Sequence, residues 1–177
     1  MTQADTLDSY GKLLAPDTLQ IERLLPGPIE RVWSYLADSD KRRKWLAAGD
    51  MPLTKGAEFQ MTWRNDDLTT PSGTRPEGFG AEHSMTSRII EATPPTRLAF
   101  TFGKASEVEI DLAPEGDKVR LTLTHRKIAD RGMMLMVGPG WHAHLDVLQA
   151  RMDGTQTAPF WDMWQRLKGD YAARIPA

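Results

Sequence analysis

Apolar and polar residues alternate along much of the chain, a pattern typical of β-strands that bury one face. The clearest alternation lies in three successive runs at 98–102, 108–112 and 119–123, separated by short segments that contain Gly. Such runs predict antiparallel strands joined by hairpins. Weaker alternation predicts three earlier strands, over 18–25, 57–64 and 82–91. The sequence therefore predicts an antiparallel sheet of about six strands.

A helical periodicity follows near the C-terminus. Trp141, Leu145, Leu148 and Met152 recur at spacings of four, three and four residues, which places them on one face of a helix over 140–153. The opposite side carries His144, Gln149, Arg151 and Asp153. Because a helix with one apolar face must bury it, we expect the sheet to curve around this helix and to leave a cavity between them.

Shorter segments complete the expected elements. Apolar residues at helical spacing over 29–36 follow a Pro-Gly-Pro turn, and a second short helix is expected over 40–46. Gly138-Pro139-Gly140 should separate the long helix from a helical turn at 133–137. Residues 65–80 lack periodicity and predict a long loop, which is either functional or disordered.

The elements suggest three parts of the chain. Residues 1–17 form an N-terminal arm, with helically spaced Leu7 and Tyr10 and a terminating Pro16, and we expect a short helix or an irregular segment there. Residues 18–153 form the main domain. Residues 154–177 form a C-terminal amphipathic segment packed on that domain, outside the grip of the sheet.

Composition excludes several classes of function. The 177 residues carry a net charge of −2, which argues against nucleic-acid binding. The absence of cysteine excludes disulfides, thiolate metal sites and a cysteine nucleophile. The N-terminus lacks a basic stretch followed by an apolar one, and no apolar run approaches a membrane span, so we expect a cytoplasmic protein.

Several motifs, taken in order, resemble the START-like SRPBCC superfamily, specifically the branch named after the activator of heat-shock-protein-90 ATPase. They are ERLLPGPIERVW at 22–33, KWL at 44–46, EATPPTRL at 91–98, LTLTH at 121–125 and GWHAHL at 140–145. The resemblance covers about residues 18–153. It implies an α+β helix-grip fold, a curved antiparallel sheet around a long C-terminal helix with two short helices after the first strand.

The resemblance also bears on function. Proteins of this fold bind or transport ligands, catalyse cyclisation or assist chaperones, and the family name suggests a link to the stress response. It does not imply ATP hydrolysis here, because the chain has no Gly-rich phosphate loop ending in Gly-Lys-Ser/Thr.

Candidate cavity residues come from two sources. By resemblance, the residue after the second helix and the inner sheet face line the cavity, and the long helix supplies the rest. The candidates for ligand binding are Trp45, Met61, Trp63, Phe100, Trp141, His142 and Leu145. His142 could hydrogen-bond the polar end of a ligand; alternatively, Trp141 is a core anchor and His142 makes only a local hydrogen bond.

Other polar residues carry weaker hypotheses. His142 and His144 are two apart and point in different directions, so we expect no metal site. His142 and Asp146 are four apart and can interact, but no nucleophile motif accompanies them, so we assign no catalytic residue or cofactor. His125 is expected in a surface turn or, alternatively, at the cavity mouth.

Two further segments leave alternatives open. His83 and Arg88 fall in opposite phases of one strand, so at most one faces inward, and an inward Arg88 could anchor a carboxylate. The Met-rich run 133–137 fills the core or forms a pliable cavity wall.

Three functions follow, in order of preference. The first is a binding protein for a small hydrophobic molecule, with no covalent chemistry. The second is a co-chaperone-like interaction module with a chaperone as partner. The third is a cyclase- or hydrolase-like enzyme that uses the cavity.

Overall fold

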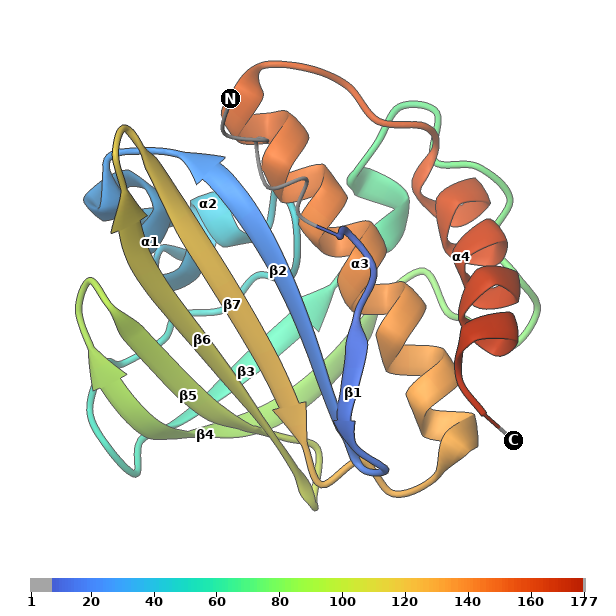
Figure 1. Ribbon diagram of the computed structural model, residues 1–177, viewed down its shortest axis with the longest axis horizontal. Helices are drawn as coiled ribbons and strands as arrows, with labels where there is room; N and C mark the ends of the chain where they lie inside the picture. Colours follow the sequence, from blue (N-terminus) through green and yellow to red (C-terminus); the bar gives the residue numbers. More distant parts are fainter. Residues whose placement is uncertain (1–7, 177) are drawn as a thin grey trace, which may run out of the picture.

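The computed structural model describes residues 8–176, which form one antiparallel sheet and a set of helices (Figure 1). The strands are β1 (Lys12–Ala15), β2 (Thr18–Pro26), β3 (Glu58–Trp63), β4 (His83–Thr93), β5 (Arg97–Phe102), β6 (Ser106–Glu115) and β7 (Lys118–Arg126). The helices are α1 (Ile29–Ala37), α2 (Ser39–Arg42), the 3-10 helix η1 (Asn65–Asp67), α3 (Arg131–Asp153) and α4 (Phe160–Arg174). The predicted α+β helix-grip fold is confirmed.

The sheet has the order β1-β2-β7-β6-β5-β4-β3, and every neighbouring pair is antiparallel. All six predicted strands are present. The additional strand is β1, in which Leu13 pairs with Leu19 of β2, so this part of the arm is extended rather than helical or irregular. The part of the predicted arm over residues 1–7 lies outside the described residues.

Helix α3 is longer than predicted. It begins at Arg131, where the Asp130 side chain accepts a hydrogen bond of 2.8 Å from the Met133 amide, and it continues through Pro139. Proline lacks an N–H, so it removes one bond of the helical ladder. This part of α3 packs closely on α4, because a Cβ added at Gly138 would lie 3.3 Å from the Tyr171 ring.

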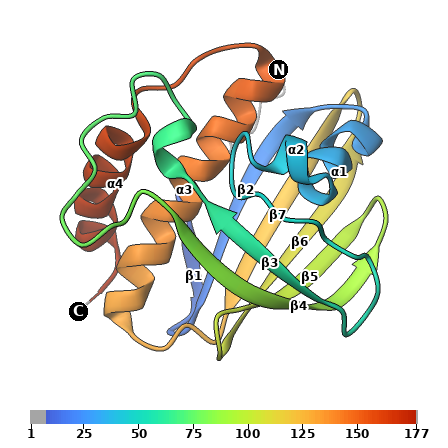
Figure 2. The same ribbon diagram turned by 180° about the vertical axis from the view of Figure 1, so that it is seen from behind.

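Helix α3 lies between the sheet and α4 (Figures 1 and 2). Its predicted apolar stripe of Trp141, Leu145, Leu148 and Met152 is buried. The prediction of a polar opposite side was wrong at His144, which is only 6% exposed. The periodicity of the sequence indicated one buried face of α3, whereas in the structure α4 covers a second face.

The long loop between β3 and β4 packs along α4 (Figure 1). The Phe160 amide donates a hydrogen bond of 2.9 Å to Thr69 Oγ1, and the Trp161 amide donates one of 3.0 Å to the Ser72 carbonyl. These acceptors satisfy the start of α4, where Pro159 supplies no side-chain cap. The loop is therefore structural, and its last residues reach the edge of the sheet.

Helix α2 ends at Arg42, four residues earlier than the predicted end at 46. The Arg42 side chain is 2% exposed and donates hydrogen bonds to the carbonyls of Leu36 and Ala47, at 2.9 and 3.1 Å. Burial lowers the pKa of Arg42 to about 10. Because this side chain binds the following loop, the chain leaves the helix and turns Trp45 into the core.

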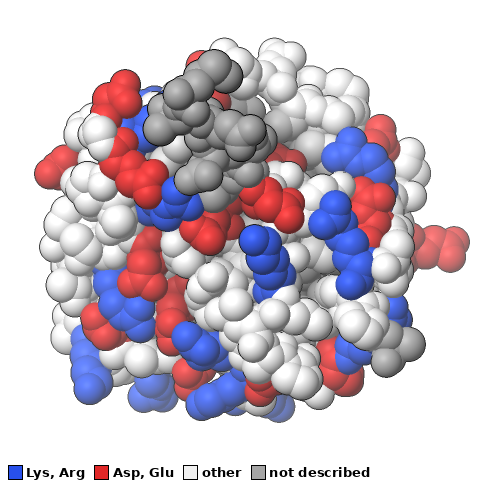
Figure 3. Space-filling model, viewed as in Figure 1, with Lys and Arg blue, Asp and Glu red and all other residues white. Residues whose placement is uncertain are grey.

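The outer face of the sheet carries charges of both signs, interleaved rather than segregated (Figure 3). Arg126 of β7 lies 3.0 Å from Glu109 of β6, and Lys127, which follows β7, lies 2.9 Å from Glu107. Each such exposed pair contributes only about 0.2–1 kcal/mol. This face is therefore solvated and electrostatically balanced.

Candidate functional site

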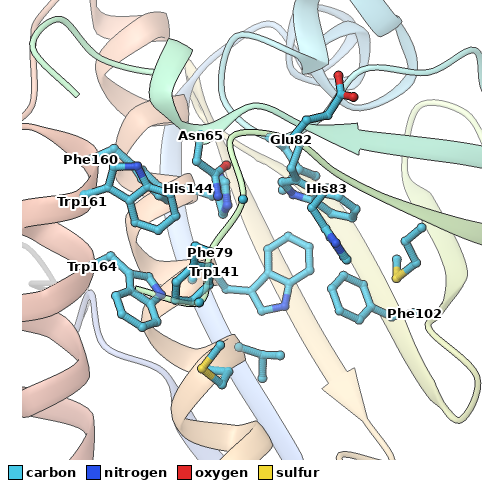
Figure 4. Close-up of a pocket in the computed structure, with 18 residues that line it drawn as sticks. Asn65, Phe79, Glu82, His83, Phe102, Trp141, His144, Phe160, Trp161 and Trp164 are labelled. Atoms are coloured by element: carbon cyan, nitrogen blue, oxygen red, sulfur yellow. The ribbon is translucent and has the colours of Figure 1, made fainter. Parts of the chain in front are cut away.

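A cavity of about 410 Å³ lies where the ends of β3 and β5 meet α3, α4 and the last residues of the long loop (Figure 4). Most of its lining is apolar and much of it aromatic. The lining residues are Leu46, Trp63, Asn65, Gly78, Phe79, Gly80, Glu82, His83, Met85, Phe102, Met136, Val137, Gly140, Trp141, His144, Phe160, Trp161 and Trp164.

The space between the centre of the sheet and α3, where we expected the cavity, is filled. The inward rows of the strands are buried, including Phe59, Val108 and Leu121. A small void beneath Trp45 and Phe100 measures about 10 Å³, about the space that one water molecule needs. The centre is therefore a close-packed core, and the open space lies at its edge.

Two of the seven candidate residues, Trp63 and Trp141, line the cavity. The ring of Phe102 lies between them, with centroids 6.1 Å from Trp63 and 5.8 Å from Trp141. Sheet and helix thus contribute adjoining parts of one aromatic wall.

The other five candidates lie elsewhere. Trp45, Met61 and Phe100 surround the small void in the core, and Leu145 is fully buried. His142 points away from the cavity, with Nδ1 3.0 Å from the Tyr171 hydroxyl. The structure therefore places their side chains in packing and hydrogen-bonding roles outside the cavity.

Sequence reasoning missed the wall formed by the loop and α4. Phe79 packs against Trp161 and Trp164 with ring centroids 5.2 and 5.1 Å away, and all three line the cavity with Phe160. Helix α4 packs on α3 outside the curve of the sheet, and Trp161 nevertheless lines the cavity. The sequence feature that could have indicated this wall is the aromatic face of the C-terminal segment, because such a face must be covered by another part of the protein.

The indole N–H groups of two cavity tryptophans are already satisfied by protein atoms. Trp141 Nε1 donates a hydrogen bond of 3.0 Å to His125 Nδ1, and Trp161 Nε1 donates one of 2.7 Å to Asp66. These bonds fix the orientation of both rings. The two rings therefore offer the cavity mainly apolar surface.

His125 is buried rather than in a surface turn. Its Nδ1 accepts the hydrogen bond from Trp141, so Nε2 carries the proton and donates to Ser106 Oγ at 2.9 Å. Burial lowers the pKa of His125 to about 4. The ring is therefore neutral at pH 7 and supports Trp141 from behind.

His144 is the most enclosed polar residue of the cavity wall. Its ring centroid lies 4.9 Å from that of Phe160, and its Nδ1 lies 2.8 Å from the Trp45 carbonyl oxygen. Burial lowers the pKa of His144 to about 4, despite the opposing effect of that hydrogen bond. At pH 7 this imidazole is neutral.

Other polar groups lie nearer the cavity mouth. Glu82 is exposed and pairs with Arg64 at 2.7 Å. His83 belongs to the lining, whereas Arg88 points outward and pairs with Glu58 at 2.7 Å, so Arg88 does not face the cavity. The Met-rich run is divided, since Met136 and Val137 line the cavity while Met134 is in the core.

A second polar cluster lies on the far side of α3. His142 Nε2 lies 3.4 Å from Asp146, which confirms the predicted interaction four residues apart, and Arg23 lies 2.9 Å from the same carboxylate. This cluster does not adjoin the cavity. Within residues 8–176, no group of three or more His, Asp or Glu side chains is placed to hold a metal ion.

Comparison with known proteins agrees with this architecture. The family model described as Activator of Hsp90 ATPase homolog 1-like protein matches residues 26–153. The solution structure of the protein encoded by BPP1335 from Bordetella parapertussis is 38% identical, with a TM-score of 0.80, and the match covers 100% of this chain and 97% of that chain.

Two more distant structures share the fold. CalU16 from Micromonospora echinospora is 23% identical with a TM-score of 0.64, over 90% of this chain and 89% of that one. EF2215 from Enterococcus faecalis, described as a conserved protein of unknown function, is 14% identical with a TM-score of 0.66, over 94% and 91% of the two chains. No curated protein matches the sequence. Among the helices described, none is long and apolar enough to cross a bilayer.

Proposed function

Since the chain belongs to the family of Activator of Hsp90 ATPase homolog 1-like proteins, we propose that it binds a small hydrophobic molecule in the aromatic cavity and performs no covalent chemistry on it. One observation carries the proposal: a space of about 410 Å³ stays open beside a core that is otherwise filled. Its aromatic lining residues are Trp63, Phe79, Phe102, Trp141, Phe160, Trp161 and Trp164.

The size and chemistry of the cavity suit a small apolar ligand. Ligand sites usually measure about 300–1,000 Å³ and combine apolar walls with a few polar groups. Each square ångström of apolar surface removed from water contributes about 25 cal/mol, and well-placed aromatic pairs add about 0.5–1.5 kcal/mol. An aromatic ligand would gain both contributions here.

The lining gives little support to the enzyme alternative. Its polar side chains are Asn65, Glu82, His83 and His144, and the described lining contains no Ser, Thr, Cys or Lys that could act as a nucleophile. Glu82 and His83 are exposed at the mouth, so neither has the enclosed environment that tunes a general acid or base.

The co-chaperone alternative, which the family name suggests, also has less support. A protein-binding face usually presents a contiguous apolar patch. In the described part of the chain the exposed large apolar residues are Leu14, Leu53, Met133 and Met136. Only the two methionines share an element, and the outer sheet face carries paired charges. We therefore rank ligand binding first.

The cavity can be filled without disturbing its walls. A Cβ added at Gly140, which lines the cavity, would meet no heavy atom within 4 Å. Gly140→Leu should therefore occupy the ligand space. The matched control is Gly169→Leu on the exposed side of α4, where an added Cβ also meets nothing within 4 Å. Both variants remove a helical glycine, so neither should lower stability by its effect on the backbone.

The test is a titration with prodan, a neutral fluorescent naphthalene. The natural protein and Gly169→Leu should bind it with the same affinity, and Gly140→Leu should bind it at least about tenfold more weakly, a difference of about 1.4 kcal/mol. Absence of binding to the natural protein, or equal binding by both variants, contradicts the proposal.

A further inference from the structure

The hydrogen bond between His144 and Trp45 fixes the proton on the imidazole. A carbonyl oxygen can only accept, so His144 Nδ1 must carry the hydrogen that it donates to Trp45 over 2.8 Å. In a neutral imidazole the other nitrogen is then an acceptor. Since burial keeps the pKa of His144 near 4, Nε2 holds a free lone pair at neutral pH.

The protein leaves this acceptor without a donor. Among the residues that the structure describes, none provides a hydrogen bond to His144 Nε2, and none provides one to the buried Oδ1 of Asn65. Both residues line the cavity, and Figure 4 shows them at the end nearer Phe160 and Trp161. Of the two atoms, the Asn65 oxygen is fully enclosed, and burial of an acceptor without a partner is unfavourable.

Two donors of the lining are already used elsewhere. The indole N–H groups of Trp141 and Trp161 are bonded to His125 and Asp66. His144 Nε2 can therefore accept a hydrogen bond from a ligand that supplies the donor.

The charges around the cavity limit which net charge the ligand can carry. The described lining contains no Lys or Arg, and its formal charge is that of Glu82 at the mouth. An anionic ligand would lose its hydration without gaining an opposite charge, which is costly in an apolar site. The ligand should therefore be neutral.

From these observations we propose that the cavity selects neutral aromatic molecules that carry a hydroxyl or N–H group, and that His144 Nε2 accepts the hydrogen bond from that group. The inference rests on the proposed function, because it names the class of ligand that the same cavity takes. The aromatic walls bind the ring system, and His144 determines how it is oriented.

Three probes of nearly equal size separate the contributions of the ring system, the donor group and the ligand charge to the affinity. Naphthalene has the ring system alone, 2-naphthol adds a neutral donor, and 2-naphthoate adds a negative charge. Their affinities are measured at pH 7.5 by displacement of prodan. The natural protein should bind 2-naphthol roughly 3–10-fold more tightly than naphthalene, although the hydroxyl makes it the better hydrated molecule. It should bind 2-naphthoate more weakly than either.

Two variants of His144 locate the acceptor. His144→Asn keeps an N–H near the Trp45 carbonyl but has no atom at the position of Nε2, so 2-naphthol should lose its advantage over naphthalene. His144→Gln reaches the Nε2 position with a carboxamide oxygen and should retain part of that advantage. Because each comparison is a ratio within one variant, a general loss of stability does not imitate the result.

The outcomes are distinct. Equal binding of naphthalene and 2-naphthol, an advantage that survives in His144→Asn, or preferred binding of 2-naphthoate overturns this inference and leaves the proposed function standing. If neither prodan nor any of the three probes binds, both proposals are overturned.

Discussion

Trp141 on α3 donates a hydrogen bond of 3.0 Å to Nδ1 of His125 on β7. The bond joins the long helix to the sheet at the cavity wall, and both side chains are almost fully buried. It also fixes the His125 tautomer, because Nδ1 must be the acceptor and Nε2 the donor to Ser106. The position of one cavity wall therefore depends on a histidine that does not line the cavity.

Replacement of His125 tests this dependence. His125→Leu leaves the Trp141 N–H buried without an acceptor, whereas His125→Asn can still supply an oxygen near the position of Nδ1. The Leu variant should have a free energy of unfolding about 1–3 kcal/mol lower than the Asn variant, as measured by urea denaturation. Equal stability of the two would show that the bond contributes nothing to the fold.

Replacement of Leu145 should lower the stability of the core without changing ligand binding in the cavity. It is fully buried and absent from the cavity lining, so Leu145→Ala should lower the free energy of unfolding by about 2–5 kcal/mol. Its affinity for prodan, measured where the variant is folded, should stay within about twofold of the natural protein. Met133→Ala, at a residue 48% exposed, is the control and should change stability by less than about 0.5 kcal/mol. An unchanged melting midpoint for Leu145→Ala contradicts the assignment.

Stability should fall in mild acid because of two buried histidines. The pKa of His125 and of His144 is lowered from 6.5 to about 4 in the folded state. Below pH 6.5 the unfolded chain therefore binds protons that the folded chain does not, which favours unfolding. Each histidine should cost roughly 1.4 kcal/mol per pH unit between about 6.5 and 4, a loss that ends once the folded state is also protonated.

The measurement is urea denaturation of the natural protein and His144→Asn at pH 7.5, 5.5 and 4.5. The variant lacks one of the two groups, so its stability should decline less steeply with falling pH. Parallel curves for the two proteins would assign the acid sensitivity to other groups.

Tyr171 holds α4, and with it one cavity wall, against α3. Its hydroxyl accepts a hydrogen bond of 2.7 Å from the Gly11 amide and lies 3.0 Å from His142 Nδ1. Tyr171→Phe leaves both partners without this oxygen and should lower the free energy of unfolding by about 1–3 kcal/mol. The matched control is Tyr10→Phe, which loses a half-buried bond to Asp170 and should cost less than about 1 kcal/mol. A larger effect in Tyr10→Phe would contradict this ranking.

Six of the seven strands, the approximate places of the α-helices and the helix-grip fold were predictable from the sequence. Alternation at Phe100, Ile110 and Leu121 reports burial on one side of a strand, and the Trp141 stripe reports burial on one side of a helix. These are local properties of neighbouring side chains, so they can be recognised without coordinates. The family motifs then fixed how the elements combine. Trp63 and Trp141, both placed on inward faces by these patterns, line the cavity at the edge of the core.

Where the interior stays open depends on contacts between segments that are separate in the sequence. Periodicity shows that a face is buried but does not identify what covers it. The side of α3 that carries His144 is buried because α4 folds back and packs Phe160 against it. The aromatic wall forms because Phe79 and Trp161, about 80 positions apart in the sequence, pack against each other. Whether an inward face becomes a filled core, as at Met61, or borders open space, as at Trp63, depends on the combined volumes of side chains from all these segments.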